Sequence, residues 1–243
     1  MSRHLVQQVK PGATTLIGDT AHHLRNVLRI KPGDQLVVFD ADGRQAEATV
    51  TAVRQGAVEL DVGESSDAAC ESPLPLALAF ALSKGEKPEW ITQKAVELGV
   101  ENIVIFQAER SVARWKKEAL PRKLERLRST IKGATAQCGR TTPADVSFAF
   151  SLEEALAKLA IYPLRIVFHT DADLPLASLL TEPTTAGVAL LCGPEGGLTA
   201  NELALLNDAG WQAGRMGPRI LRAETAALAA VALVQGLLGD LTR

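Results

Sequence analysis

The chain contains 243 residues, of which 47% are hydrophobic and 22% charged, and its formal net charge is -2. These values are typical of a globular protein with a real core and exclude a chain that is largely disordered. No apolar run reaches the roughly 20 residues that span a bilayer, and the first ten residues lack the apolar stretch of a secretory signal, so we expect a cytoplasmic protein.

The first sixty residues have the pattern of a small β domain. A short helix is expected to start at a Thr20 cap and to end near residue 28. Strands are expected at residues 3–9, 35–39, 44–53 and 57–62. Turn signals, such as the aspartate and glycine residues at 40–43, separate these strands at a spacing of about ten residues, which favours a compact barrel.

The composition then changes at residues 63–75, which have no apolar period and are rich in serine, aspartate, alanine and proline. Such a stretch is typical of a linker. We therefore divide the chain into a first domain at residues 1–72 and a second at residues 73–243.

The second domain alternates apolar runs with helical patterns. Buried strands are expected at residues 76–82, 103–106, 165–168 and 188–192. Helices are expected at residues 89–98, 121–138, 152–159 and 201–209, followed by an apolar helix at 226–238 for a buried or interface position. This alternation predicts an α/β domain with a mostly parallel sheet covered on both faces.

One glycine-rich loop, Gly193-Pro194-Glu195-Gly196-Gly197, follows the apolar run at 188–192 and precedes a capping-box pattern formed by Thr199 and Glu202. Ligands of open α/β sheets bind beyond the carboxyl ends of strands, where glycine lets the backbone approach them. The alternative is a tight turn that needs glycine. The order of the glycines matches neither a dinucleotide-binding fingerprint nor a P-loop.

A second polar loop at residues 216–225 brings Arg219, Arg222, Glu224 and Thr225 to the start of the last helix. These side chains can form one pocket with the glycine-rich loop, or Glu224 and Thr225 can simply cap the helix. A third polar patch at residues 83–88 precedes the helix that contains Trp90. We expect Trp90 and Trp115 to pack in the core or between helices, because large aromatic side chains contribute so much burial, and the alternative is that they stack on bases.

Positive charge is concentrated at residues 110–132, which contain nine lysine and arginine residues but only two glutamates. This segment is either a solvated helix face or a surface for a polyanion. Cys70, Cys138 and Cys192 are widely spaced, which favours structural thiols, and adjacent His22 and His23 cannot point the same way. We therefore expect no metal.

At these motifs the sequence resembles the bacterial small-subunit ribosomal RNA uridine-N3 methyltransferases of the SPOUT superfamily. The resemblance covers nearly the whole chain in order, and its motifs are residues 23–29, 84–87, 90–99, 109–112, 137–140, 193–197 and 219–226. One departure is Ala136, which stands before Gln137 where many relatives have a glutamate.

The resemblance implies a PUA-like N-terminal barrel that helps to hold RNA, and a SPOUT domain whose C-terminal part forms a trefoil knot. It also implies a homodimer that packs through the last helix. The implied cofactor is S-adenosyl-L-methionine, and the implied partner is small-subunit ribosomal RNA in an assembled 30S particle.

By the same resemblance, the cofactor would lie against three loops. The implied cofactor-binding residues are His169, Thr170, Leu191, Cys192, Gly193, Pro194, Glu195, Gly196, Gly197, Met216, Gly217, Ile220, Leu221, Arg222, Thr225 and Ala226. The expected contacts to RNA are Arg3, Arg25, Arg29, Lys84, Lys87, Arg110 and Arg114.

Uridine N3 must lose a proton before it can accept a methyl group, and its negative charge spreads onto O2 and O4. Arg222 or Arg140 is expected to stabilise that anion. Glu224 or Glu195 is expected to accept the proton, directly or through water, unless it only caps a helix or orients an arginine.

Two other functions remain open. A SPOUT enzyme acting on a ribose 2'-hydroxyl or on transfer RNA would have much the same cofactor loops, although the motifs at 84–115 and 137–140 favour the uridine enzyme. A silent RNA-binding or ribosome-assembly factor would keep the fold without needing the cofactor.

Overall fold

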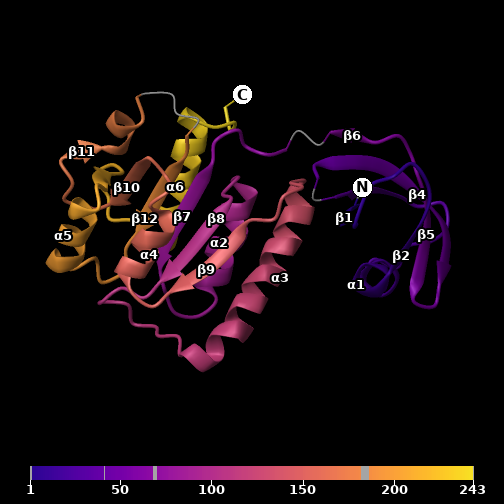
Figure 1. The fold of residues 1–243 in the computed structure, drawn as a ribbon, viewed down its shortest axis with the longest axis horizontal. Helices are drawn as coiled ribbons and strands as arrows, with labels where there is room; N and C mark the ends of the chain where they lie inside the picture. Colours follow the sequence, from indigo (N-terminus) through magenta and orange to yellow (C-terminus); the bar gives the residue numbers. More distant parts are fainter. Residues whose placement is uncertain (1, 41, 68–69, 182–185, 243) are drawn as a thin grey trace. The chain divides into compact units, whose positions relative to one another are not determined.

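The computed structural model describes residues 2–40, 42–67, 70–181 and 186–242. Ala41 of the predicted turn and Ala68 and Ala69 of the predicted linker lie outside these ranges, as do Met1 and Arg243 of the predicted domains. The chain forms two compact units, which Figure 1 colours by sequence. Unit 1 comprises Met1–Glu71 and Thr135–Pro143, and unit 2 comprises Ser72–Ala134 and Ala144–Arg243.

Unit 1 is a six-stranded sheet with a short helical segment, and four of its strands lie where the spacing of the turns predicts them. Its strands are β1 (Ser2–Leu5), β2 (Gly12–Ile17), β3 (Gln35–Phe39), β4 (Arg44–Arg54), β5 (Ala57–Val62) and β6 (Ser66–Asp67). Their order is β1-β3-β4-β5-β2, with β6 paired to β4. Helix α1 (Gly18–His22) continues into a π-helical turn, η1 (His23–Val27).

The core of unit 1 forms because alternate residues of its strands point inward. Ala46, Ala48 and Val50 of β4 are buried in this way, and Leu24 of η1 packs against the same cluster. Strand β2 was not predicted. Only Leu16 of its six residues is buried, so its sequence carries little apolar alternation.

Unit 2 contains a seven-stranded sheet in which every recorded pairing is parallel. Its strands are β7 (Leu76–Ala81), β8 (Asn102–Phe106), β9 (Asp145–Ala149), β10 (Leu164–Phe168), β11 (Leu174–Pro175), β12 (Val188–Cys192) and β13 (Gln212–Arg215). Their order is β11-β13-β10-β12-β7-β8-β9. The predicted α/β fold with a parallel sheet is confirmed.

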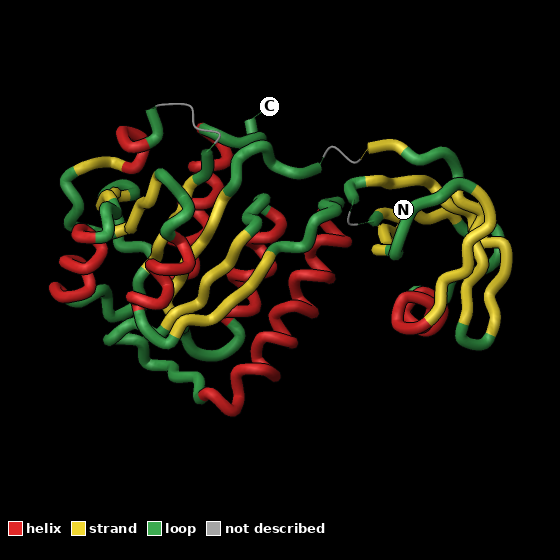
Figure 2. Tube along the Cα trace, in the orientation of Figure 1, coloured by secondary structure: helices red, strands yellow, loops and turns green. Residues whose placement is uncertain are grey.

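Helices cover both faces of this sheet, as Figures 1 and 2 show. Its helices are α2 (Lys87–Glu97), η2 (Lys117–Ala119), α3 (Leu120–Cys138), α4 (Leu152–Leu159), η3 (Leu176–Leu179), α5 (Ala200–Asp208) and α6 (Ala223–Leu237). Helices α4 and α5 share one apolar cluster with the sheet, whereas α2 packs against α6. The whole of β7 and β12 is buried, which explains their uninterrupted apolar sequences.

Neither Trp90 nor Trp115 is fully buried. Trp90 was expected in the core or between helices, and with 46% of its surface exposed it is not a core residue. It lies at the start of α2, where the buried positions are Pro88, Ile91 and Thr92. Trp115 is half-buried and stacks on Phe148. Residues 135–143, assigned to the second domain from sequence, group with unit 1.

Candidate functional site

A large cavity opens at the carboxyl edge of the unit 2 sheet. Because β10, β12 and β13 are parallel, the loops that follow them meet at one edge. The cavity has a volume of about 1050 Å³, the upper end of the size typical of small-molecule sites. It is lined by residues 168–170, 175, 192–198, 214–223 and 226.

The cavity contains most of the residues expected to contact a cofactor. Of the sixteen, only Leu191 and Thr225 do not line it. Leu191 is fully buried inside β12, and Thr225 is exposed on the first turn of α6. The cavity also has walls that were not foreseen, including Phe168, Gly214 and Arg215.

The glycine-rich loop is fixed by close packing. A Cβ atom on Gly193 would lie 2.9 Å from Cγ of Leu198, and one on Gly196 would lie 3.2 Å from Cβ of Arg110. Gly197 has φ +71°, a backbone conformation that other residues rarely adopt. Glycine is therefore favoured by space at Gly193 and by conformation at Gly197, and a side chain at position 196 would be in tight contact with Arg110.

The helix after this loop begins as predicted. Thr199 Oγ1 accepts a hydrogen bond from the Glu202 amide at 3.2 Å, and Glu202 Oε2 accepts one from the Thr199 amide at 2.8 Å. The capping box is thus confirmed. Glu202 is buried, and its other carboxylate oxygen accepts a hydrogen bond from the Glu109 amide at 2.9 Å, so it ties the loop after β12 to the loop after β8.

The second cofactor loop leaves β13 and leads into α6. Gly217 turns with φ +70°, and the guanidinium of Arg215 donates to the carbonyl oxygens of Ala172 and Asp173 at 3.4 Å and 3.1 Å. Ile220 is 88% exposed although it lines the cavity. An apolar side chain this exposed beside a cavity is suited to cover a bound ligand.

Lys87 joins the two cofactor loops. Its Nζ lies 2.9 Å from Glu195 Oε1 and 3.2 Å from Glu224 Oε2. The hydrogen bond to Glu195, followed by that to Glu224, raises the pKa of Lys87, and the bond from Lys87 lowers the pKa of Glu195. Lys87 and Glu195 therefore both favour their charged forms at the edge of the cavity, and Glu195 binds a proton less readily than an ordinary glutamate.

The basic segment meets the same loop. Arg110 donates from Nη1 to the carbonyl oxygen of Gly196 at 3.2 Å, and Arg114 donates to the Glu109 carbonyl at 2.9 Å. Both guanidinium groups are exposed, as is Lys84. The cavity also contains the buried thiol of Cys192, whose pKa burial raises to about 12, so it is inert as a nucleophile.

The remaining predicted residues lie in unit 1. Arg3 donates to Gln45 Oε1 and to the Gly139 carbonyl, both at 2.9 Å, and its guanidinium lies over the Phe39 ring. Arg25 and Arg29 are exposed. Arg140 is buried and its Nε lies 2.8 Å from Glu71 Oε2, so it belongs to a different unit from Arg222, Glu224 and Glu195.

Two family models match this chain. Residues 70–235 match a family model described as an RNA methyltransferase domain, and residues 16–62 match one described as an RNA methyltransferase PUA domain. Both models describe domains of RNA methyltransferases.

Curated relatives are similar over almost their whole length. The ribosomal RNA small subunit methyltransferase E of Bacillus subtilis is 32% identical, with 94% of this chain and 92% of that protein covered. The protein of the same name from Mycobacterium tuberculosis is 34% identical, with 95% and 88% covered.

A solved structure is similar in fold as well. The ribosomal RNA small subunit methyltransferase E of Neisseria gonorrhoeae, determined with bound S-adenosyl methionine, superimposes with a TM-score of 0.89 at 31% identity. The superposition covers 99% of each chain.

Proposed function

This chain belongs to the RNA methyltransferase family that includes the ribosomal RNA small subunit methyltransferases E, and we propose that it methylates N3 of one uridine in 16S ribosomal RNA. S-adenosylmethionine is the methyl donor, and the reaction is methylation of small-subunit ribosomal RNA. The choice of the uridine N3 atom rests on the family resemblance of the motifs at 84–99, 109–112 and 137–140.

The observation that carries the cofactor assignment is the cavity enclosed by the loops after β10, β12 and β13. Its walls combine apolar side chains, such as Ile220 and Leu221, with peptide groups exposed at Gly193 and Gly196. Such walls suit a ligand that has a flat purine, a ribose and a charged amino-acid tail. The residues present therefore fit S-adenosylmethionine.

When bound, this cofactor supplies a methyl group already activated by the sulfonium, so the protein has to align the acceptor and make it nucleophilic. Arg222 lines the cavity and is exposed, which suits a donor to the uridine oxygen atoms as negative charge develops there. The role expected for Arg140 stays a prediction.

The proton of uridine N3 needs an acceptor. Glu195 lines the cavity, but Lys87 holds its pKa below the usual range, so its protonated form is disfavoured. Glu224 is held by the same lysine, and its side chain is only 15% exposed. Even with a lowered pKa a carboxylate is a stronger base than water, so we assign the proton to Glu224 or Glu195, directly or through a water molecule.

We assign RNA contacts to exposed cations of both units. Arg110 and Arg114 stand beside the glycine-rich loop, and Arg25 and Arg29 lie in the unit that matches the PUA domain. Contacts of this kind position an RNA backbone but do not select a base. That the substrate is an assembled 30S particle stays a prediction.

A homodimer is supported by the outer surface of α6 and α2. Leu233 and Leu237 of α6 are 46% and 56% exposed, and Trp90 of α2, a helix that packs on α6, is also exposed. Large apolar side chains on packed neighbouring helices are typical of a subunit interface. The knot implied by the resemblance stays a prediction.

A cytoplasmic location follows from a ribosomal substrate. Within the described ranges, none of the helices combines the length and apolarity needed to cross a membrane.

Mass spectrometry of 16S ribosomal RNA from a strain that lacks the gene tests the proposal. One N3-methyluridine should disappear and should return when the wild-type gene is restored. A modification lost instead from a ribose 2'-hydroxyl, or from transfer RNA, would overturn the assignment, as would no loss at all.

A further inference from the structure

Three aromatic side chains gather where β8 and β9 end. Trp115 comes from the loop after β8, Phe148 lies in β9 and Phe150 follows β9. The rings of Trp115 and Phe148 stack with centroids 5.0 Å apart and an angle of 22° between their planes. Phe150 meets Phe148 edge-on at 5.1 Å and 82°. We call these three residues the aromatic cluster.

Two lysines cover the cluster from outside. Nζ of Lys123 lies 5.5 Å from the ring centroid of Trp115, and Nζ of Lys117 lies 5.7 Å from that of Phe150. Because Phe148, only 7% exposed, takes the inner face of the Trp115 ring, the ammonium group lies on the outer face. Trp115 and Phe150 are themselves half-buried, and the lysines over their rings are long, flexible side chains that can move aside.

The surroundings of the cluster are strongly basic. Between residues 110 and 123 there are six lysine and arginine residues and one glutamate. Five of the six cations are exposed, namely Arg110, Arg114, Lys116, Lys117 and Arg122. Aromatic rings set among cations are the combination that binds single-stranded nucleic acid, since the cations hold phosphates and the rings stack on bases.

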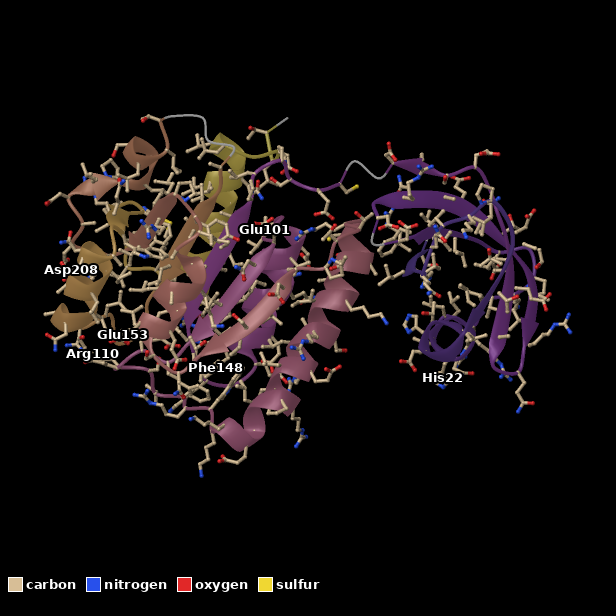
Figure 3. All side chains as sticks on the ribbon, in the orientation of Figure 1. His22, Glu101, Arg110, Phe148, Glu153 and Asp208 are labelled. Carbon is tan, nitrogen blue, oxygen red and sulfur yellow. The ribbon has the colours of Figure 1, made fainter. Side chains whose placement is uncertain are left out.

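The cluster lies on the same edge of the sheet as the cavity. Strand β8 is two places from β12 in the parallel sheet and β9 is three places away, so the ends of β8 and β9 lie about 10 to 15 Å from the end of β12 at the usual strand spacing. Figure 3 labels Phe148 near the end of β9. A base held here would lie within a few nucleotides of a base in the cavity.

We propose that Trp115 and Phe150 form a stacking site for an unpaired base of the substrate RNA, a few nucleotides from the methylated one. The proposal rests on the proposed function and adds to it a site for a neighbouring nucleotide. Stacking of a base on an aromatic ring is stronger than an exposed cation–π contact. The lysine displaced from the ring then pairs with the phosphate of the same nucleotide, so the exchange is favourable.

Two RNA probes of equal charge separate stacking from phosphate contacts. One is a short single-stranded RNA of mixed sequence, and the other is the same length of abasic chain. Fluorescence anisotropy of the full-length protein should show tighter binding of the base-bearing probe by about tenfold. Trp115→Leu should reduce that ratio to about twofold while affinity for the abasic probe stays the same.

Matched variants control this experiment. Trp115→Phe keeps an aromatic ring and should keep most of the ratio of the two affinities. Lys123→Gln should weaken binding of the abasic probe more than binding of the base-bearing probe, and so should raise that ratio. Melting temperature and cofactor affinity check that each variant is folded. If Trp115→Leu fails to fold, photocrosslinking of a 5-bromouridine probe to the wild-type protein replaces it, with crosslinks expected at Trp115 or Phe150.

The possible failures can be told apart. If the wild-type protein binds neither probe, the stacking site is wrong, whereas the proposed function itself fails only if the deletion strain keeps its N3-methyluridine. If the wild-type protein binds both probes equally, if Trp115→Leu keeps the wild-type ratio, or if crosslinks avoid the aromatic cluster, only the stacking site is wrong.

Discussion

Lys87 Nζ lies 2.9 Å from Oε1 of Glu195, although 108 residues separate the two along the chain. The same ammonium lies 3.2 Å from Glu224 Oε2, so a residue of α2 ties together two loops that line or flank the cavity. Lys87 and Glu195 follow strands β7 and β12, and they lie close together because these two strands are neighbours in the sheet.

We expect Lys87→Met to weaken binding of S-adenosylmethionine about three- to tenfold, because two partly exposed ion pairs that hold the loops are lost. Isothermal calorimetry measures the change. Lys94→Met is the matched control, since Lys94 lies on the same helix but pairs with Glu97. Equal affinity of all three proteins would show that Lys87 does not position the loops.

The same cluster predicts how stability depends on pH. The pKa of Glu195 is lowered from its ordinary 4.5, mainly by Lys87, and that of Lys87 is raised from 10.5, mainly by Glu195. The lowered carboxylate stabilises the fold above its unfolded pKa and loses this effect as pH falls through its folded pKa. The raised ammonium stabilises the fold below its unfolded pKa and loses this effect as pH rises through its folded pKa.

The difference in melting temperature between wild type and Lys87→Met should therefore be constant near neutral pH. It should shrink as pH falls below 4.5 and as it rises above 10.5, the ordinary values of the two groups. Differential scanning calorimetry across that range measures it. A difference that grows at either extreme would contradict the ion-pair account.

Gly193→Ala should destabilise the glycine-rich loop, because its Cβ would lie 2.9 Å from Leu198 Cγ. Crowding of this kind costs about 1 to 3 kcal/mol, and affinity for S-adenosylmethionine should fall with it. Gly133→Ala is the control, since nothing lies within 4 Å of its Cβ position in α3. Alanine favours a helix, so this variant should melt at the same or a higher temperature. The packing argument is refuted if Gly193→Ala melts as the wild type does and binds the cofactor equally well.

Arg222→Ala should lower turnover about 100-fold or more, as loss of a donor to a developing anion does. Cofactor affinity should change little. A methyl-transfer assay with tritiated cofactor measures turnover, and calorimetry measures affinity. Arg222→Lys, which keeps a positive charge, should retain part of the activity. Turnover near the wild-type value in Arg222→Ala would remove this residue from the mechanism.

Strong apolar patterns made much of unit 2 predictable. The bounds of strand β12 and helix α4 were predicted to the residue. Strand β12 is an apolar run between polar segments, and α4 has a serine cap followed by apolar residues at helical spacing. Strand β13 was missed, since Gln212–Arg215 is polar apart from Ala213 and Gly214 and is held by pairing with β10 and β11. That strand carries Gly214 and Arg215, the cavity walls that were not foreseen.

The composition of the loops allowed the position of the cavity to be predicted, but not the side-chain contacts at its edge. Glycines that need space or a positive φ are visible in a sequence, and the loops that carry them do line the cavity. The contact of Lys87 with both loops was not predictable, because it depends on β7 lying beside β12. The same holds for Arg140, whose segment groups with unit 1.

The most direct test of the central claim is a crystal structure of the protein with S-adenosylmethionine. We predict one ligand per chain, enclosed by Gly193–Gly197 on one side and Met216–Arg222 on the other. A ligand bound elsewhere, or a protein that takes up no cofactor at saturating concentration, would contradict the assignment of this cavity and of the reaction.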